Sequence, residues 1–338
     1  MPPADGEPAP DRGRPQPRLL HLGNVVIDVI MYVPALPEPG GDVLASRAEL
    51  AAGGGFNVLA AAARQGLPAA YAGAHGTGPF GDLARAAMAA AGIAVLQPPK
   101  PDCDTGFVLT AVDACGERTF LTSPGAEATL TDADLAPIRP ADDDLVYLSG
   151  YGLAHAANAP VLLRWLSRLP EPNLVTFDPG PLVSSLPGDA LAAVLARTDW
   201  LTCNAREAAL MTGTADPAAA ARTLASRLAG AHAAASGRPG ALRSPGVVVR
   251  TGPDGCLLTE PGSDPVAAPG FPVTPVDTNG AGDAHAGVFL AGLAARLPTA
   301  DAVRRANAAA AISVTRRGPA SAPGAAEIDQ FLTARHSV

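Results

Sequence analysis

Three things are scarce in this sequence: cysteine pairs, long apolar runs and positive charge. The four cysteines are spread along the chain without a C-x-x-C pair, so neither a disulfide framework nor a zinc site is expected. No stretch has the ~20 unbroken apolar residues that a membrane span needs. The N-terminal segment also lacks the apolar run of a signal peptide. We therefore expect a reduced, soluble, cytoplasmic protein that has no membrane partner.

The shortage of positive charge bears on possible partners. Lysine and arginine number 24 against 32 aspartates and glutamates, which gives a net charge of −8. Because nucleic-acid binding needs a basic face, no nucleic-acid partner is expected. Hydrophobic residues, in contrast, make up 48% of the 338 residues, enough for a substantial core. Much of this fraction is alanine, which predicts helices packed closely on a sheet.

Short apolar runs alternate with alanine-rich stretches from residue 19 onward. The alternation predicts βαβ units, and therefore an α/β fold with a mostly parallel sheet covered by helices. Residues 1–17 are rich in proline and charge and are expected to be a disordered tail, so that the domain spans 18–338. The expected strands are LLHLGNVVIDVIMYV (19–33), AAYAGA (69–74), IAVL (93–96), LVYLS (145–149), LVTFD (174–178), WLTC (200–203) and VVVR (247–250).

Two regions break the alternation. Residues 105–123 contain two strand-like runs around a polar turn with no helix between them, which predicts a hairpin. Joined by strands from 25–50, this hairpin would form a small projecting sheet, so a lid built from about 25–50 and 103–123 is expected. The second region, 229–246, is expected to be a long surface loop.

The stretch DTNGAGDAHAG (277–287) places a glycine-rich turn before a helix-like pattern. Such a turn exposes N–H groups at the positive end of a helix dipole and favours anions. An acid on the first turn, Asp283, would repel phosphate unless it accepts a proton from a hydroxyl during phosphoryl transfer. This interpretation makes Asp283 the general base and the backbone of Gly280, Ala281 and Gly282 the anion hole. The alternative is an ordinary N-cap aspartate on a glycine-rich turn.

Four segments stand out in order along the chain: AAGGGFNVLAAAARQG (51–66), TCNAREAALMTG (202–213), DTNGAGDAHAGVFLAGL (277–293) and ANAAAAISVTRRG (306–318). Together they resemble the signatures of the PfkB (ribokinase-like) carbohydrate kinase family. The resemblance implies a Rossmann-like three-layer ribokinase-type core with a small β-sheet lid. It also implies that the chain is an ATP-dependent carbohydrate kinase, which uses Mg²⁺ and transfers the γ-phosphate to a hydroxyl of a sugar-like alcohol.

The resemblance also assigns residues to the nucleotide and its metal. Asn204 and Glu207 would organise Mg²⁺, its waters and the phosphates, and Mg²⁺ indeed prefers oxygen ligands and keeps several waters. The alternative for this pair is a helix N-cap with its N3 partner. Gly252 and Asn307 are expected beside the nucleotide, although Asn307 has the alternative of a polar residue on a packed helix.

Sugar binding is assigned to residues near the start of the chain. An aspartate and an asparagine can each engage vicinal hydroxyls, and glycines let a sugar approach the backbone. By itself, the aspartate could be a turn residue at a strand end. The residues implied are Asp28, Gly53, Gly54 and Asn57.

A monovalent cation and a second subunit are further implications of the resemblance. K⁺ would lie beside the anion hole, near Asp277, Asn279 and the turn 316–318. A lone two-stranded ribbon cannot bury all the apolar residues of the hairpin, so they should cover the sugar or meet the lid of a second subunit. We therefore expect a homodimer joined through the lids. The apolar residues are Phe107, Leu109, Phe120 and Leu121.

Three features look chemical but are interpreted as structural. GTGPFG (76–81) fits a dinucleotide pattern, but Pro79 removes an N–H that a pyrophosphate would need, so we expect a turn. His285 would point away from Asp283 along the helix and is expected to pack. The acidic run 142–144 is expected to be a solvated lead-in to a strand.

Departures from the family pattern leave the substrate open. Ribose-specific members carry polar residues at positions that correspond to Val26, Gly54 and Gly150, so ribose is in doubt. Arg250 stands where a threonine near the ATP phosphates is usual, which we expect to alter nucleotide affinity. A sugar kinase that acts on a primary hydroxyl is the main hypothesis. The alternatives are a nucleoside kinase of the same fold and a non-catalytic sugar or nucleotide sensor; a nicotinamide oxidoreductase would rest on GTGPFG alone.

Overall fold

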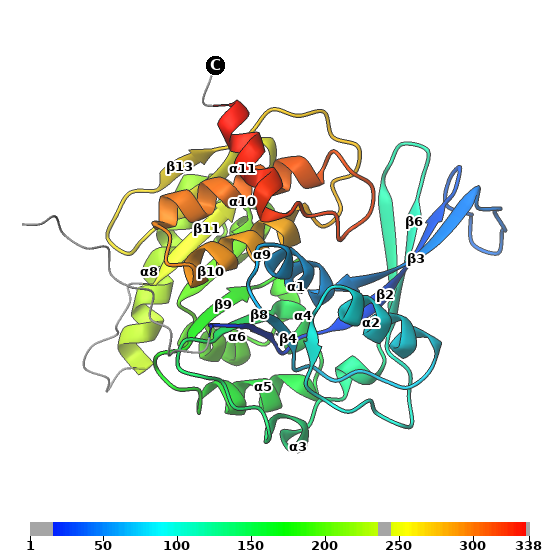
Figure 1. The fold of residues 1–338 in the computed structure, drawn as a ribbon, viewed down its shortest axis with the longest axis horizontal. Helices are drawn as coiled ribbons and strands as arrows, with labels where there is room; N and C mark the ends of the chain where they lie inside the picture. The colour runs from blue at the N-terminus through cyan, green and yellow to red at the C-terminus, as the bar shows by residue number, and fades with distance from the viewer. Residues whose placement is uncertain (1–15, 236–244, 336–338) are drawn as a thin grey trace, which may run out of the picture.

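The computed structural model describes residues 16–235 and 245–335. The body of the protein is a nine-stranded sheet between two layers of helices (Figure 1). All neighbouring strands are parallel except the pairs β11–β12 and β12–β13, an antiparallel edge that the sequence did not predict. In spatial order the strands are β13 (Val266–Pro269), β12 (Gly255–Thr259), β11 (Gly246–Arg250), β10 (Trp200–Asn204), β9 (Leu174–Asp178), β8 (Leu145–Ser149), β1 (Leu19–His21), β4 (Ala69–Tyr71) and β5 (Ala94–Val95).

The helices bury both faces of this sheet. Successive strand residues point to opposite sides, so Leu19 and Val248 belong to one core and Leu20 and Val249 to the other. Helices α1 (Gly55–Arg64), α2 (Pro79–Ala90), α9 (Ala281–Ala294), α10 (Thr299–Ser313) and α11 (Ala325–Ala334) pack on the first core. On the second lie α3 (Asp132–Leu135), α4 (Gly150–Ala154), α5 (Asn158–Leu166), α6 (Gly188–Leu195), α7 (Ala205–Thr212) and α8 (Pro217–Ala235). The predicted three-layer α/β class is thus confirmed.

A separate four-stranded sheet projects from one side of the body (Figure 1). Its strand order is β3-β2-β6-β7, with β2 and β6 parallel and the other pairs antiparallel. The predicted hairpin and small sheet are therefore present, although β3 continues past the expected limit at residue 50. The strands are β2 (Val25–Tyr32), β3 (Arg47–Gly54), β6 (Phe107–Val112) and β7 (Arg118–Ser123).

The apolar run 19–33 is two strands, not one. It contributes β1 to the main sheet and β2 to the small sheet, with a break at residues 22–24. Gly23 permits this break, because an added Cβ there would lie 2.4 Å from the ring of His21. The first strand of the core thus leads directly into the lid. The run IAVL forms a strand only over its middle residues, as β5.

Two other expectations need correction. The predicted loop 229–246 is wrong at its start, because α8 continues to Ala235; residues 236–244 lie outside the described residues. The acidic run 142–144 is not wholly solvated, because Asp144 is 1% exposed and pairs with Arg18 at 2.8 Å. Burying a carboxylate needs such a partner, which the acidic run alone did not reveal. The predicted tail lies almost entirely outside the described residues, and no helix within them is long and apolar enough to cross a membrane.

Candidate active site

Polar residues gather where the central parallel strands end. Asp178 closes β9, Asn204 closes β10 and Arg250 closes β11, and the sheet register pairs Asn204 with Arg250. Ligands of open α/β sheets bind at this carboxyl edge of the strands. The first turn of α9 meets the same edge, because Gly282 lies beside Arg250.

Residues 280–282, which we call the anion loop, begin α9. Gly280 has a φ of 74°, and an added Cβ would lie 1.8 Å from the carbonyl oxygen of Pro319, so only glycine fits. No side chain caps the helix. The N–H groups of its first turn lack intrahelical partners, and they can therefore receive an anion.

Asp283 lies on the first turn of α9, one residue after the anion loop. Its Oδ2 accepts a hydrogen bond from Asn57 Nδ2 of α1 at 2.9 Å. Burial raises the pKa of Asp283 to about 6; the Asn57 hydrogen bond and Arg250 lower it, whereas Asp178 and Asp28 raise it. A carboxylate with this pKa is ionised at neutral pH and remains a usable proton acceptor.

The predicted sugar residues lie in the small sheet and at the start of α1, where Asn57 contacts Asp283. Asp28 of β2 lies over Gly53 of β3, where an added Cβ would be 2.3 Å from the Asp28 carboxylate. Burial raises the pKa of Asp28 to about 6. Asn57 Oδ1 is buried without a hydrogen-bond partner, and an unsatisfied acceptor of this kind can receive a substrate hydroxyl. Gly54 has a φ of 61°, and an added Cβ would lie 2.8 Å from the Asn24 carbonyl oxygen, which explains why no lysine stands here.

Asn204 and Glu207 form the capping box that was the alternative interpretation of this pair. Glu207 Oε2 accepts from the Asn204 backbone N–H and Asn204 Oδ1 from the Glu207 N–H, both at 2.8 Å. Burial and the charge of Asp178 raise the pKa of Glu207. Among the described residues no group of three or more metal-ligating side chains occurs. The carboxylates of Glu207 and Asp178 nevertheless fit a hydrated Mg²⁺, because this ion needs few protein ligands when phosphates and waters supply the others.

The two expected nucleotide neighbours differ in what they contact. Gly252 has a φ of 70° with open space around it, which leaves room for a ligand. Asn307 is buried and donates to the carbonyl oxygens of Ala268 and Pro269 at 2.9 and 3.2 Å, so it ties α10 to β13. Asn307 thus has the structural function that was its alternative, and its contact with a nucleotide stays a prediction.

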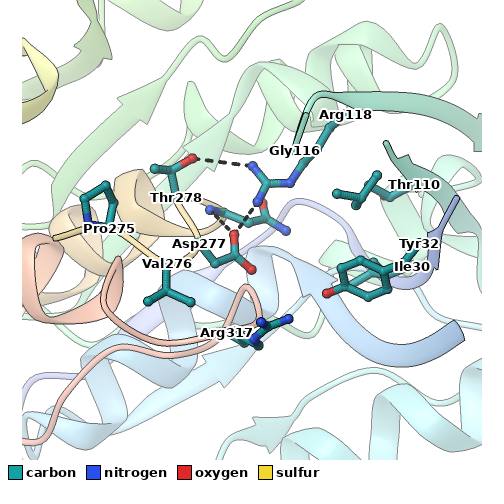
Figure 2. A pocket seen from close by; sticks show the side chains of 12 residues that line it. Ile30, Tyr32, Thr110, Gly116, Arg118, Pro275, Val276, Asp277, Thr278 and Arg317 are labelled. Carbon is teal, nitrogen blue, oxygen red and sulfur yellow. Dashed lines mark hydrogen bonds and ion pairs between the residues drawn. The ribbon is translucent and has the colours of Figure 1, made fainter. Parts of the chain in front are cut away.

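A cavity of about 250 Å³ lies between the small sheet and residues 275–279 (Figure 2). The guanidinium of Arg118, from β7, points across it to Asp277 and forms an ion pair with that carboxylate. Asp277 also accepts from the N–H groups of Asn279 and Gly318 at 2.9 and 3.0 Å. The residues implied for K⁺ are therefore close together. However, Arg118, which the sequence analysis did not assign to this site, already pairs with the Asp277 carboxylate.

Of the features interpreted as structural, His285 packs as expected, but GTGPFG is not simply a turn, because Pro79, Phe80 and Gly81 begin α2. His285 is buried in α9, where burial and then Arg250 lower its pKa to about 3. In GTGPFG the N–H groups of Phe80 and Gly81 donate to the carboxylate of Asp104 at 3.0 and 2.7 Å. This helix N-terminus already binds an acid of the chain itself, so a dinucleotide site is not needed to explain the motif.

Asp178 is a site residue that the sequence did not single out. Its Oδ2 accepts two hydrogen bonds from Arg250, each at 3.0 Å. The available signal was its position, because an acid as the last residue of a predicted parallel strand lies at the ligand edge.

The chain matches a known protein family and individual relatives over most of its length. The model of the pfkB family carbohydrate kinases matches residues 16–325. The chain belongs to the pfkB family of carbohydrate kinases. A protein named uncharacterized sugar kinase YegV from Escherichia coli is 33% identical over 308 residues, 91% of each chain. The ATP-dependent ribose-1-phosphate kinase of Halopiger xanaduensis is 30% identical over 94% of this chain and 99% of its own. The predicted kinase family is thus confirmed.

Solved structures of this family share the fold. Ribokinase from Thermotoga maritima has a TM-score of 0.75 at 24% identity, covering 94% of this chain and 99% of its own. Ribokinase from Arabidopsis thaliana, solved with ribose and ATP, has a TM-score of 0.71 at 22% identity, with the same coverage of the two chains. At these identities the likeness confirms the ribokinase-type fold, and the substrate of this pfkB kinase has to be argued from its site.

Proposed function

We propose that this pfkB kinase transfers the γ-phosphate of ATP to a hydroxyl, preferably primary, of a small carbohydrate. The observation that carries the proposal is the position of Asp283. Its carboxylate, with a pKa of about 6, directly follows the anion loop in the chain. The same carboxylate accepts a hydrogen bond from Asn57, one of the residues that would bind a sugar. A proton acceptor and an anion site within one helical turn are what phosphoryl transfer to an alcohol requires.

In this mechanism the acceptor oxygen attacks the γ-phosphorus and forms a new O–P bond. Asp283 takes the hydroxyl proton, the bond from the γ-phosphorus to the bridging oxygen breaks, and ADP leaves with that electron pair. The N–H groups of the anion loop stabilise charge on the phosphoryl oxygens. Asp28 and Asn57 orient the sugar. Mg²⁺, held through water by Glu207 beside Asp178, would neutralise charge on the phosphates.

The small sheet acts as the lid in this proposal. It presents Asp28 to the sugar and excludes water, which would otherwise hydrolyse ATP. K⁺ beside Asp277 and Asn279 remains part of the proposal, with Arg118 as its competitor for the carboxylate. The homodimer through the lids also remains a proposal, which the exposed residue Leu121 supports.

An acceptor panel tests the proposed function. ADP release would be measured with ATP and Mg²⁺ against pentoses, hexoses, their phosphates and nucleosides, with a no-acceptor control. We expect at least tenfold stimulation by one carbohydrate over that control. Stimulation by nucleosides alone would replace the proposal with a nucleoside kinase. Binding of a sugar without ADP release would indicate a non-catalytic sensor.

A further inference from the structure

Arg250 brings a positive charge to the edge of the sheet where the anion loop lies. Its side chain is 13% exposed and donates to Asp178 Oδ2 from both Nη atoms, at 3.0 Å, and to Thr202 Oγ1 at 2.8 Å. Glu207 lies 3.8 Å away. Burial alone would lower the pKa of Arg250, but Asp178 and Glu207 hold it above its ordinary value, so the residue stays charged.

The same guanidinium lies beside the anion loop. An added Cβ on Gly282 would lie 3.5 Å from Arg250 Cζ and 3.6 Å from Nε and Nη2, which is ordinary van der Waals contact. The charge is therefore fixed beside the residue that immediately precedes Asp283. Because two bonds to Asp178 and one to Thr202 restrict the side chain, its place does not depend on a bound ligand.

This charge stands in a site that is otherwise acidic. Asp28 and Asp178 both raise the pKa of Asp283, and Arg250 opposes them. Glu207 adds a further carboxylate at the same edge. A phosphoryl group with its own negative oxygens would be repelled by these acids unless a cation compensates for them.

We propose that Arg250, held by Asp178 and Thr202, is a positioning residue that fixes a positive charge against the anion loop, where the transferred phosphoryl group is received. The inference rests on the proposed kinase function and deepens it. The charge acts through two neighbours: it keeps Asp283 ionised for proton acceptance, and it offsets repulsion of the phosphoryl oxygens at the loop. The threonine usual at this position in the family could not supply this charge.

The groups around this pair determine how pH should act. The tyrosines keep their protons between pH 5 and 9, since burial raises the pKa of Tyr151 to about 12 and that of Tyr147 well above its ordinary value, and His285 stays neutral. Asp283, Asp28 and Glu207 are the groups with raised carboxyl pKa values. The facing groups are Asp28 of β2, Tyr147 of β8, Tyr151 of α4, Asp178 of β9, Cys203 of β10, Glu207 of α7, Arg250 of β11 and His285 of α9.

The first test is the pH profile of kcat with ATP and acceptor saturating. Arg250→Gln should lower the plateau about 10- to 100-fold, the scale of a lost charge-stabilising contact, and move the acid limb to higher pH by about half a unit or more. Arg250→Lys, which keeps the charge, should leave the acid limb within about 0.3 unit of wild type. Asp178→Asn removes a negative charge and should therefore move the acid limb in the opposite direction, to lower pH.

These variants separate positioning from a merely structural role. A structural role would lower the melting temperature of Arg250→Gln and leave the acid limb of its folded fraction in place, which would overturn the proposal. An acid limb that moves to higher pH in Asp178→Asn would overturn it as well. Asp178→Asn and Arg250→Lys decide the question if Arg250→Gln does not fold.

A second test needs no acceptor. Calorimetry would compare the binding of MgADP with and without aluminium fluoride, which mimics the phosphoryl group in transfer. Wild type should bind tighter with the fluoride, and Arg250→Gln should lose most of this gain while its MgADP affinity stays within about threefold. An equal gain in the variant would overturn the proposal. Absence of ADP release with every acceptor would contradict the proposed function instead, and the calorimetry would still decide the role of Arg250.

Discussion

The main sheet and the small sheet are built from similar apolar residues but expose them very differently. Leu20 and Val247 of the main sheet are fully buried between helices, whereas Leu50 and Leu121 of the small sheet are 56% and 61% exposed. A sheet covered on both faces holds its strand ends rigidly, which suits the groups that perform chemistry. A sheet with open faces is suited to contacts with something outside the chain's own core.

The two faces of the small sheet are themselves different. Strand residues two apart share a face, and the sheet register joins Leu50, Val29, Leu109 and Leu121 into one apolar row. The opposite face carries Asp28, together with Ile30, Thr110, Phe120 and Arg118, and part of it lines the cavity in Figure 2. Phe107 was expected to cover the sugar or to meet a second subunit. It packs instead on Phe80 of α2, with ring centroids 5.1 Å apart. We therefore propose that the main sheet carries the chemistry, and that opposite faces of the lid contact the sugar and a second subunit.

The largest expected effect comes from the main body. Gly280→Ala should lower kcat by about 10²-fold or more, because the new methyl group collides with Pro319 and displaces the N–H groups of the anion loop. Gly66→Ala is the matched control, since Gly66 also has a positive φ but nothing within 4 Å. The control should cost about 1 kcal/mol of stability and leave kcat within about twofold. Similar kcat values for both variants would contradict the assigned function of the loop.

The next effect comes from the inner face of the lid. Asp28→Asn should raise the acceptor KM by about 10- to 100-fold, the scale of lost hydrogen bonds to a charged group, with a smaller change in kcat. Because the pKa of Asp28 is about 6, wild-type KM should rise as pH falls through 6 and the carboxylate is protonated. The variant should lack this rise. A KM that depends on pH equally in both proteins would exclude Asp28 as the sugar ligand.

A neighbouring pair on β7 separates the two faces of the lid. Phe120→Asp should raise the acceptor KM by roughly tenfold, because it places a charge on the face that covers the sugar. Leu121→Asp should weaken the dimer in light scattering and change KM less, because it lies on the opposite face. ATP affinity should change little in either variant. A wild-type monomer at assay concentrations would refute the dimer, and an unchanged KM in Phe120→Asp would refute the cover.

The smallest effect is expected at the ion pair between lid and body. Wild type should turn over faster in K⁺ than in Na⁺ at matched ionic strength. Arg118→Gln should lower kcat by only about two- to fivefold and widen that difference, because partly exposed ion pairs contribute little and a free Asp277 binds a cation better. Equal rates in the two salts for both proteins would remove K⁺ from the account.

Local patterns predicted much of the fold. Parallel strands such as LVTFD are short, mostly apolar runs, and the hairpin stands out because no helix separates its strands. The split of 19–33 between two sheets was missed, because both parts have the same strand composition, although Gly23 and Asn24 at the break are residues typical of turns. The extension of α8 was missed because its last residues, which are mostly alanine and favour a helix, were grouped with the glycine- and proline-containing sequence that follows them.

The candidate site shows the same limit. Asp283 and the anion loop stand out because glycines and an acid occur at fixed spacing. Other site residues depend on distant ion-pair partners. Arg250 and Asp178 are 72 residues apart in the sequence, and Arg118 and Asp277 are 159 residues apart. The pairings themselves leave no local pattern in a single sequence, although the position of Asp178 at a strand end and the departure of Arg250 from the family pattern were visible there.

The central claim, that Asp283 of the main body is the base for phosphoryl transfer to a sugar, is tested most directly by one substitution. Asp283→Asn and the control Asp301→Asn alter the third residue of α9 and α10, and Asp301 is exposed. With the best acceptor, formation of the sugar phosphate would be followed by ³¹P NMR and MgATP binding by calorimetry. We expect Asp283→Asn to lower kcat by about 10²-fold or more with ATP affinity nearly unchanged, and Asp301→Asn to match wild type. Turnover of Asp283→Asn within a few-fold of wild type would contradict the account.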